Sequence, residues 1–427
     1  MKKKILFGLS TAALAVAALA SCGQKADLKT VSMFGGTDPH AKVYEQLIKE
    51  FEKETGKKVG DSSQVSDEDW KTSVVSSFVS GDEADVLFFF TGANAKPFIE
   101  NNKVVSIEEI RKEYPDYAKN IPDDRLDSHA VTLKGMVEGM FVNTELLTGD
   151  MSKYATMDKW SWDDFMAVCD GLTKAGKTPV ALGAQEVPHY WIEHLVLGMN
   201  GPEAFKNIPS EADFNAATGE GNTAADKWIK ALKMFNVLDQ KGVFGANHGN
   251  SKNDAATTAF LGGNAGMYVD GSWFAGSVTN ETKAKPDKVK MIPFPAIPEE
   301  LGGMNKFYSQ SGFTTGFYIS RKAWENEEKR DLAVKFVEKM TSDAAIKAYC
   351  EAAGGIPASP TVKVDGLTPL GESMNGVIAL TEATTLPLSD LSKANTFPTL
   401  VSASAAYLNG EVNLIKKALA EYAKLQK

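Results

Sequence analysis

Cysteine and histidine are scarce in this chain. Its 427 residues include three cysteines and five histidines. Beyond the N-terminal segment only Cys169 and Cys350 remain, too few for a disulfide framework. Each lies in an apolar helical pattern, so we expect buried free thiols. His189 and His194 are five residues apart and therefore fall on different sides of a helix, unlike the two histidines of a zinc-protease motif. We expect no metal and no other cofactor.

An excess of positive charge is also missing. The formal net charge is −9, and it becomes −12 without the three lysines of the N-terminal segment. This balance argues against nucleic acid or an anionic lipid surface as the partner, and it is compatible with a neutral or a cationic ligand. After Cys22 no apolar run approaches the about 20 residues that cross a bilayer.

Signatures of catalysis are absent as well. The chain has no Gly-x-Ser-x-Gly elbow and no phosphate-binding loop, and Gly262-Gly263-x-x-Gly266 follows a predicted helix, which is the wrong context for a dinucleotide fingerprint. The paired acids Asp163-Asp164 are explained by the preference of helix starts for negative charge. We therefore expect a protein that is not an enzyme.

The N-terminal segment predicts export and a lipid anchor. Lys2, Lys3 and Lys4 precede the apolar run Ile5–Ala20, as in a secretory signal. Leu19-Ala20-Ser21-Cys22 resembles the bacterial lipobox, in which the cysteine is lipid-modified and becomes the mature N-terminus. We expect residues 1–21 to be removed, Cys22 to carry lipid, and residues 22–27 to be a tether. The expected location is the outer face of the cell membrane.

Strand and helix patterns alternate along the mature chain. Residues 84–90 form a continuous apolar run typical of a strand buried on both faces, and a helical pattern at 43–51 precedes it. This order predicts an α/β fold. Further strands are expected at 30–34, 135–143, 266–269, 289–293 and 316–320, and further helices at 162–175, 189–199, 223–238, 254–261, 329–340, 343–352 and 411–425.

Four segments resemble the sugar-binding family of solute-binding proteins of ABC importers, which includes maltose-binding protein. The most specific is Ala259-Phe260-Leu261-Gly262-Gly263-Asn264-Ala265-Gly266-Met267-Tyr268-Val269-Asp270-Gly271-Ser272-Trp273. The others are Glu138 to Leu147, Trp162-Asp163-Asp164-Phe165 and Gly354-Gly355-Ile356-Pro357-Ala358. The sequence departs from the family at Phe141-Val142, where tyrosines are usual, and in its aromatic run Phe88-Phe89-Phe90.

The resemblance implies two α/β lobes that hold a ligand in the cleft between them, a periplasmic-binding-protein-like fold. Closure of such lobes around ligand is a known domain motion. We expect lobe one to comprise 28–141 and 288–324, and lobe two to comprise 142–287 and 325–427. Hinge strands are expected near Met140–Asn143, Lys288–Ile292 and Phe317–Arg321.

Trp273 and Asp270 are the leading candidates for the binding site. A sugar presents hydroxyls that need directional hydrogen bonds and an apolar face that an aromatic ring covers. Trp273 follows a short strand and a Gly turn, and it matches the stacking aromatic of the family; the alternative is a tryptophan packed in the core. Asp270 either accepts bonds from hydroxyls or forms the turn before Gly271.

Other candidates lie on loops at predicted strand ends, where open α/β sheets bind ligands. Asp38 either binds ligand or caps the helix that follows it. Tyr190 and Trp191 are adjacent, so one of the two is expected in the core. The remaining candidates are Gly36, Thr91, Asn94, Glu138, Gln185, Glu186, Ser311, Gly312, Gly355 and Ile356.

The expected function is a monomeric, lipid-anchored receptor that delivers a carbohydrate, an oligosaccharide above all, to the permease of an ABC transporter. A second hypothesis keeps the fold and replaces the sugar by another solute such as a polyamine, which a cleft lined mostly by carboxylates would favour. A third is a secreted glycan-active enzyme, which needs two essential carboxyls in the cleft.

Overall fold

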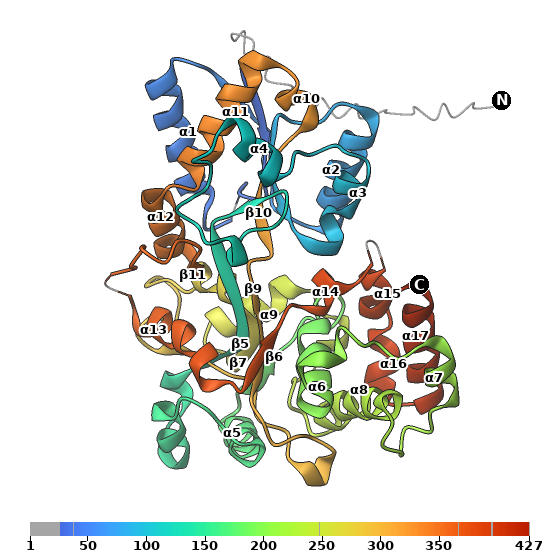
Figure 1. Ribbon diagram of the computed structural model, residues 1–427. Coiled ribbons are helices and arrows are strands. Elements are labelled where there is room, and N and C mark those ends of the chain that lie inside the picture. Colours follow the sequence, from blue (N-terminus) through green and yellow to red (C-terminus); the bar gives the residue numbers. More distant parts are fainter. Residues whose placement is uncertain (1–25, 37, 247, 366, 394–395, 427) are drawn as a thin grey trace, which may run out of the picture.

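The computed structural model describes residues 26–426, apart from 37, 247, 366 and 394–395, so the predicted signal and Cys22 lie outside the described residues. The chain forms two α/β lobes built on two sheets (Figure 1). The predicted two-lobe α/β fold is confirmed. Among the described residues, no helix combines the length and apolar character needed to cross a bilayer.

Lobe one is built on a five-stranded sheet in the order β2-β1-β3-β10-β4. β1 is parallel to β2 and β3, whereas β10 is antiparallel to both of its neighbours. The strands are β1 (Leu28–Val31), β2 (Val59–Asp61), β3 (Val86–Phe90), β4 (Val131–Thr132) and β10 (Thr315–Ile319). The helices are α1 (Ala41–Thr55), α2 (Glu68–Ser80), α3 (Lys96–Glu100), α4 (Ile107–Glu113), α10 (Arg321–Trp324), α11 (Glu327–Met340) and α12 (Asp343–Ala353).

Lobe two is built on a sheet in the order β12-β9-β5-β7-β6, with β8 and β11 also paired to the long strand β5. The strands are β5 (Lys134–Asn143), β6 (Thr178–Ala181), β7 (Ala265–Gly271), β8 (Val289–Ile292), β9 (Tyr308–Gly312), β11 (Ile356–Pro357) and β12 (Ala383–Thr385). The helices are α5 (Trp162–Lys174), α6 (His189–Asn200), α7 (Glu211–Ala216), α8 (Ala224–Gln240), α9 (Asn253–Leu261), α13 (Pro369–Gly376), α14 (Leu388–Leu391), α15 (Phe397–Ser402), α16 (Ser404–Asn409) and α17 (Val412–Leu425).

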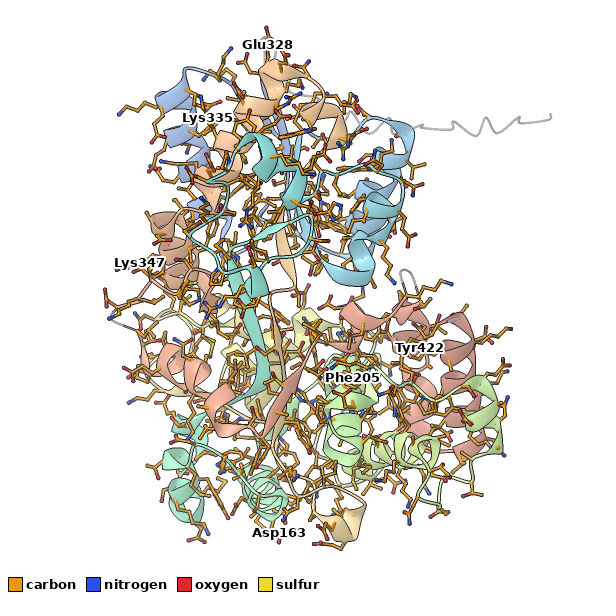
Figure 2. The ribbon with its side chains drawn as sticks, in the orientation of Figure 1. Asp163, Phe205, Glu328, Lys335, Lys347 and Tyr422 are labelled. Carbon is orange, nitrogen blue, oxygen red and sulfur yellow. The ribbon has the colours of Figure 1, made fainter. Side chains whose placement is uncertain are left out.

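Each lobe has its own apolar core. Buried side chains such as Phe205 and Tyr422 fill lobe two, and charged side chains such as Glu328 and Lys335 point outward from lobe one (Figure 2). The two predicted thiols lie in different cores: Cys169 belongs to lobe two and Cys350 to lobe one, and both are free and buried. Burying this apolar surface is the main driving force for folding of each lobe.

The predicted lobe boundaries need correction in two places. β8 and β9 lie in the sheet of lobe two, so of the segment 288–324 only β10 and α10 belong to lobe one. Conversely, α11 and α12, expected in lobe two, pack on α1 in lobe one. The sequence shows that these segments are amphipathic or apolar, but it does not show which of two similar cores they cover.

The predicted hinges are displaced for the same reason. Met140–Asn143 and Val289–Ile292 pair with each other inside the sheet of lobe two, and Phe317–Ile319 lie inside the sheet of lobe one. The chain instead passes between lobes at Leu133–Lys134 and at Phe313–Thr314. After α12 the chain touches lobe two again where β11 pairs with the start of β5, and it makes its last passage between Val364, which packs on the core of lobe one, and α13, which packs on β8.

Arg125 ties these passages together. Its guanidinium donates at 3.0 Å to the carbonyls of Pro357 and Ala358 and lies 5.6 Å from the centre of the Phe313 ring. Its own carbonyl accepts from the Thr132 hydroxyl, which comes just before the first passage. The Arg125 side chain of lobe one thus contacts segments of the chain that lie next to the passages between the lobes.

Candidate functional site

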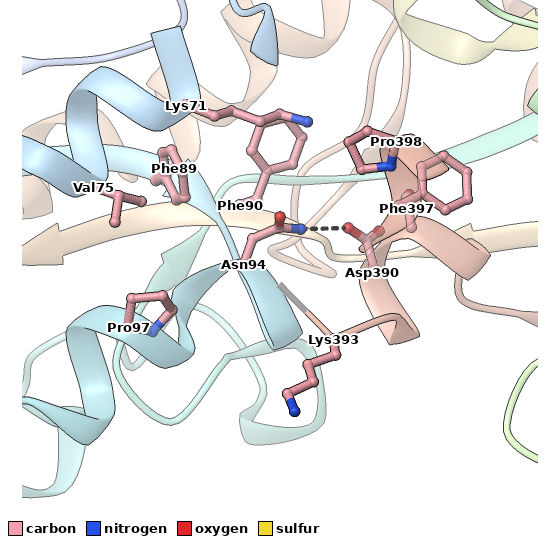
Figure 3. A pocket seen from close by; sticks show the side chains of 11 residues that line it. Lys71, Val75, Phe89, Phe90, Asn94, Pro97, Asp390, Lys393, Phe397 and Pro398 are labelled. Carbon is pink, nitrogen blue, oxygen red and sulfur yellow. Dashed lines mark hydrogen bonds between the residues drawn. The ribbon is translucent and has the colours of Figure 1, made fainter. Parts of the chain in front are cut away.

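The two lobes face each other across a small cavity of about 60 Å³ (Figure 3). Lobe one contributes Phe90 at the end of β3 and the turn that follows it, η1 (Gly92–Ala95); lobe two contributes α14 and the start of α15. The lining residues are Lys71, Val75, Phe89, Phe90, Asn94, Pro97, Ser389, Asp390, Lys393, Phe397 and Pro398. Ligand pockets usually measure about 300–1,000 Å³, so this cavity admits a sugar only when the lobes move apart.

A direct contact closes the cavity. The Asn94 amide lies 3.5 Å from the Asp390 carboxylate (Figure 3). Gly92 has φ +62, and a Cβ added there would lie 3.0 Å from the Asp390 carbonyl oxygen. Glycine at this position therefore permits both the backbone conformation and the close approach of the two lobes.

A row of partly exposed aromatic side chains runs along the lobe-two wall of the cleft. The Phe397 ring lies 5.3 Å from His189, His189 lies 4.2 Å from Tyr190, and Tyr190 lies 6.2 Å from Trp273, measured between ring centres. On the opposite lobe, Phe90 lies at the edge of the cavity with the Lys71 ammonium 4.4 Å from its ring centre. Such rings offer flat apolar faces to a ligand.

Trp273 reaches this row because of the glycine two residues before it. It lies in the short helix η7 (Ser272–Ser277), which follows β7. Its ring folds back over Gly271, where a Cβ would lie 2.2 Å from the indole. Any other residue at position 271 would therefore push the indole away from Tyr190. This explains the Gly turn before the aromatic in physical terms.

Four buried carboxyl groups lie behind and beside the aromatic row. Asp270 is the last residue but one of β7, Glu138 lies on β5 opposite Gly271, Glu193 comes from α6 and Asp390 from α14. Burial raises the pKa of Asp270 to about 7, that of Asp390 to about 7 and that of Glu193 to about 8. The pKa of Glu138 is also raised, first by burial and then by repulsion from the other three carboxyls.

Other groups within this cluster modify those shifts. The Gly271 N–H donates to the Asp270 carboxylate at 2.7 Å, and hydrogen bonding from Tyr268, Trp273 and Tyr190 further opposes the rise in the pKa of Asp270. The Gln310 amide donates to Glu138 at 2.7 Å. Burial lowers the pKa of His194 to about 3, so this imidazole, 3.9 Å from Glu138, is neutral at physiological pH.

The structure brings three of the predicted residues together. Trp273 and Asp270 lie at the end of β7, Glu138 lies on the neighbouring strand β5, and Tyr190 lies 6.2 Å from Trp273 between ring centres. Of the adjacent pair, Trp191 is the core residue: it is 0% exposed and contacts Phe244 and Phe294 edge-on. The prediction that Trp191 binds ligand is therefore wrong, because helical geometry turns it away from Tyr190 and into lobe two.

Other predicted residues lie apart from this wall. Glu186 is exposed and accepts from the Asn253 N–H at the start of α9. Thr91 is buried at the second passage between lobes, where its N–H donates to the Thr314 carbonyl at 2.8 Å. Ser311 is bound to the carbonyl of Met136 on β5. These side chains make structural hydrogen bonds.

A second group of candidates gathers around Lys134, at the first passage. Asp38 accepts from the His40 N–H at 2.8 Å in the turn before α1, and it makes no capping bond to the helix itself. The Lys134 ammonium donates to the Gly354 carbonyl at 2.8 Å, and burial lowers the pKa of Lys134 to about 8. Gly355 has φ +112, and a Cβ there would meet the Gly135 carbonyl at 2.8 Å. Gly36 is exposed nearby, also at positive φ.

Sequence reasoning missed several residues of the cleft: Lys71, His189, Glu193, Gln310, Asp390 and Phe397. Asp390 lies in Leu388-Ser389-Asp390-Leu391, which has the pattern of an ordinary solvated helix start. The spacing of His189 and His194 bears only on metal binding and does not indicate a place in the cleft. The one available signal was the aromatic run Phe88-Phe89-Phe90, whose last member reaches the cavity. Within the described part of the chain, no three His, Cys, Asp or Glu side chains are grouped to hold a metal ion.

The fold and the cleft together define a two-lobe ligand-binding protein. The chain matches the bacterial extracellular solute-binding protein family over residues 37–347, and it belongs to that family. The family places it outside the cytoplasm. No match was found among curated proteins.

Solved structures with the same fold cover nearly the whole chain. A chitin oligosaccharide binding protein is 17% identical with a TM-score of 0.77, covering 93% of this chain and 98% of its own. The solute-binding protein RafE in complex with raffinose is 17% identical with a TM-score of 0.74, covering 94% and 99%. A maltose-maltodextrin binding protein of Alicyclobacillus acidocaldarius is 15% identical with a TM-score of 0.65, covering 94% and 100%. At these identities the similarity concerns the fold alone.

Proposed function

We propose that this protein is a lipid-anchored receptor that captures a carbohydrate, an oligosaccharide above all, between its lobes and delivers it to an ABC importer. The observation that carries the proposal is the aromatic row Phe397, His189, Tyr190 and Trp273 with carboxyls beside it. Rings cover the C–H face of a sugar, and carboxylates accept from its hydroxyls. The structural neighbours whose names mention chitin oligosaccharides, raffinose and maltodextrin support the same class of ligand.

Binding would couple to closure of the lobes. An open form exposes the aromatic row and admits the ligand, and contacts from Phe90 and Asn94 on lobe one then favour the closed form. The permease would recognise that closed surface. The family and the named neighbours are binding proteins, which supports binding without turnover.

A thermal-shift screen of the purified chain against mono- and oligosaccharides tests the proposal. A ligand at about 100 times its Kd adds about 2.7 kcal/mol to the free energy of unfolding, a shift of a few degrees for a chain of this size. We expect one oligosaccharide series to raise the melting temperature, and we expect Trp273→Ala to abolish this increase. Chromatography after incubation should show that the sugar is unchanged. No shift with any carbohydrate contradicts the sugar proposal, and cleavage of the sugar contradicts the absence of catalysis.

Delivery and anchoring need separate tests in cells. Deleting the gene for this protein should abolish cellular uptake of the ligand identified in the screen, measured with a radiolabelled form of that ligand. Cys22→Ser should remove labelling by a fatty-acid probe and move the protein from the membrane fraction to the medium or periplasm, while the ligand affinity of the purified variant stays unchanged. A Cys22→Ser protein that remains membrane-bound contradicts the lipid anchor but leaves the ligand proposal intact.

A further inference from the structure

The buried carboxyl cluster beside the cleft has more negative charge than its protein partners compensate. Glu138, Glu193, Asp270 and Asp390 are 2%, 1%, 3% and 8% exposed, and they come from four separate elements, so their proximity follows from the tertiary fold and not from one local turn. Burying a charge is costly unless it is paired.

The hydrogen bonds show which kind of group is lacking. Both carboxyl oxygens of Glu193 and the side-chain oxygen of Gln310 are buried without a hydrogen bond of ordinary geometry, although the Gln310 side chain and the Ser389 backbone lie close enough to Glu193 to oppose the rise in its pKa. Gln310 already donates its amide to Glu138, so its own unmatched oxygen is an acceptor, and the carboxyl of Glu193 supplies two more acceptors when it is ionised. A group rich in donors would complete the cluster, and a cationic group would in addition favour the ionised form of its carboxyls.

Neighbouring cations offset only part of this charge. The Lys71 charge lowers the pKa of Asp390 across the cleft, but this ammonium lies over the Phe90 ring on the opposite lobe. His194 is the basic side chain nearest Glu138, and it is neutral because burial lowers its pKa. Lys393 lines the cavity from the rim and is exposed.

We propose that the natural ligand carries an ammonium group, as an amino-sugar oligosaccharide does, and that the carboxyl cluster recognises it. Asp390, which lines the cavity, and Asp270, beside Trp273, would contact the ammonium, while Glu138 and Glu193 lie behind them and act through their charge. The aromatic row covers the C–H faces of the sugar rings and adds a cation–π attraction. This inference rests on the proposed carbohydrate function and names its ligand class.

The ligand class is tested by isothermal titration of the purified chain with β-1,4-linked glucosamine oligomers and with the same oligomers N-acetylated, which lack the charge. We expect the amine oligomers to bind at least tenfold more tightly at low salt, with the difference shrinking as salt increases. Asp390→Asn should bring the ratio of the two affinities close to one, whereas the affinity for the acetylated oligomer changes little. Glu203→Gln, which removes an exposed acid from the same lobe, should leave the ratio unchanged.

Each outcome decides a different part of the argument. If the acetylated or another neutral oligosaccharide binds as tightly as the amine oligomer, the amine inference fails and the carbohydrate function stands. If putrescine or spermidine binds and no sugar does, both fail and the polyamine hypothesis replaces them. If nothing binds, both fail. Thermal unfolding of Asp390→Asn shows whether a lost preference reflects lost folding, and Asp270→Asn provides a second charge-removing variant in that event.

Discussion

The two lobes differ in how their interiors meet the cleft. Lobe one approaches it with the aromatic end of β3, in which Phe88 and Phe89 are each 1% exposed and Phe89 and Phe90 line the cavity. In lobe two the buried groups near the cleft are polar. Glu193, Gln310 and His194 each have buried side-chain atoms without a hydrogen-bond partner. A core stabilised by packing alone would not keep such groups.

The difference indicates that the two lobes have different roles in ligand binding. Lobe two carries the polar and aromatic groups that would recognise the ligand, and lobe one supplies a smaller surface that closes over it. Recognition then depends mainly on residues of lobe two, whereas lobe one determines how much binding is converted into closure. Substitutions on the two sides should therefore affect different measurements.

The largest expected effect is a difference in stability between two tryptophan variants of lobe two. Trp191→Ala should lower the free energy of unfolding by about 3–5 kcal/mol, because it empties a fully buried site between Phe244 and Phe294. Trp273→Ala, at a partly exposed site, should cost much less stability and instead abolish detectable sugar binding. Chemical denaturation and isothermal titration on both variants measure the two effects. Equal losses of stability would show that Trp273 is also a core residue.

A second expectation concerns the pH dependence of stability. The buried carboxyls of lobe two make the first contribution to it. The pKa values of Asp270 and Asp390 are about 7 and that of Glu193 about 8 in the folded chain, above the unfolded values near 4. Between these values the folded state binds more protons than the unfolded state. The contribution of these groups to stability is therefore present at low pH and is lost as pH rises from about 4 to about 8.

Three buried or partly buried histidines act in the opposite direction at lower pH. The pKa of His189 and that of His194 are about 3 and that of His40 about 4, below the ordinary value of 6.5, because burial disfavours the charged ring. Their contribution is lost as pH falls below about 6.5, so histidines and carboxyls oppose each other between pH 4 and 6.5. Above pH 6.5 only the carboxyls of this group remain active.

The ligand-free protein should therefore melt at a lower temperature at pH 8.5 than at pH 6.5. Glu193→Gln should flatten this decrease, since Glu193 has the highest pKa of the three, and Glu203→Gln should leave it unchanged because that acid is exposed. Melting curves by circular dichroism at the two pH values measure the difference. If the melting temperature of the unmodified chain stays the same or rises from pH 6.5 to pH 8.5, the carboxyls of the cluster are not buried without compensating partners.

The same contrast between lobes explains what sequence could predict. Periodicity found most helices and strands, and the Gly271-Ser272-Trp273 segment found one wall of the cleft, because these features depend on near neighbours along the chain. Which lobe α11 or β8 joins depends on pairing over long sequence distances, and both apolar patterns fit either core. Asp390 escaped notice for that reason: its partners Asn94 and Lys71 are about 300 residues away in sequence.

The smallest expected effect tests closure from the side of lobe one. Gly92→Ala places a methyl group 3.0 Å from the Asp390 carbonyl and forces a residue with a side chain to adopt φ +62. Gly56→Ala imposes similar backbone strain at φ +68, at the end of α1, with no atom within 4 Å of the added Cβ. Both variants should lose about 1 kcal/mol of stability from strain, so strain alone cannot separate them.

Ligand affinity should separate the two glycine variants. Because only the methyl at position 92 presses against α14, Gly92→Ala should weaken binding by roughly fivefold to tenfold, about 1–1.4 kcal/mol, while Gly56→Ala binds like the unmodified chain. The loss should appear mainly as faster dissociation in surface plasmon resonance, since the open form still admits the ligand and the closed form is what holds it. Equal affinity in the two variants would mean that the contact between Gly92 and Asp390 is not part of the ligand-bound state, and that lobe one closes over the ligand elsewhere.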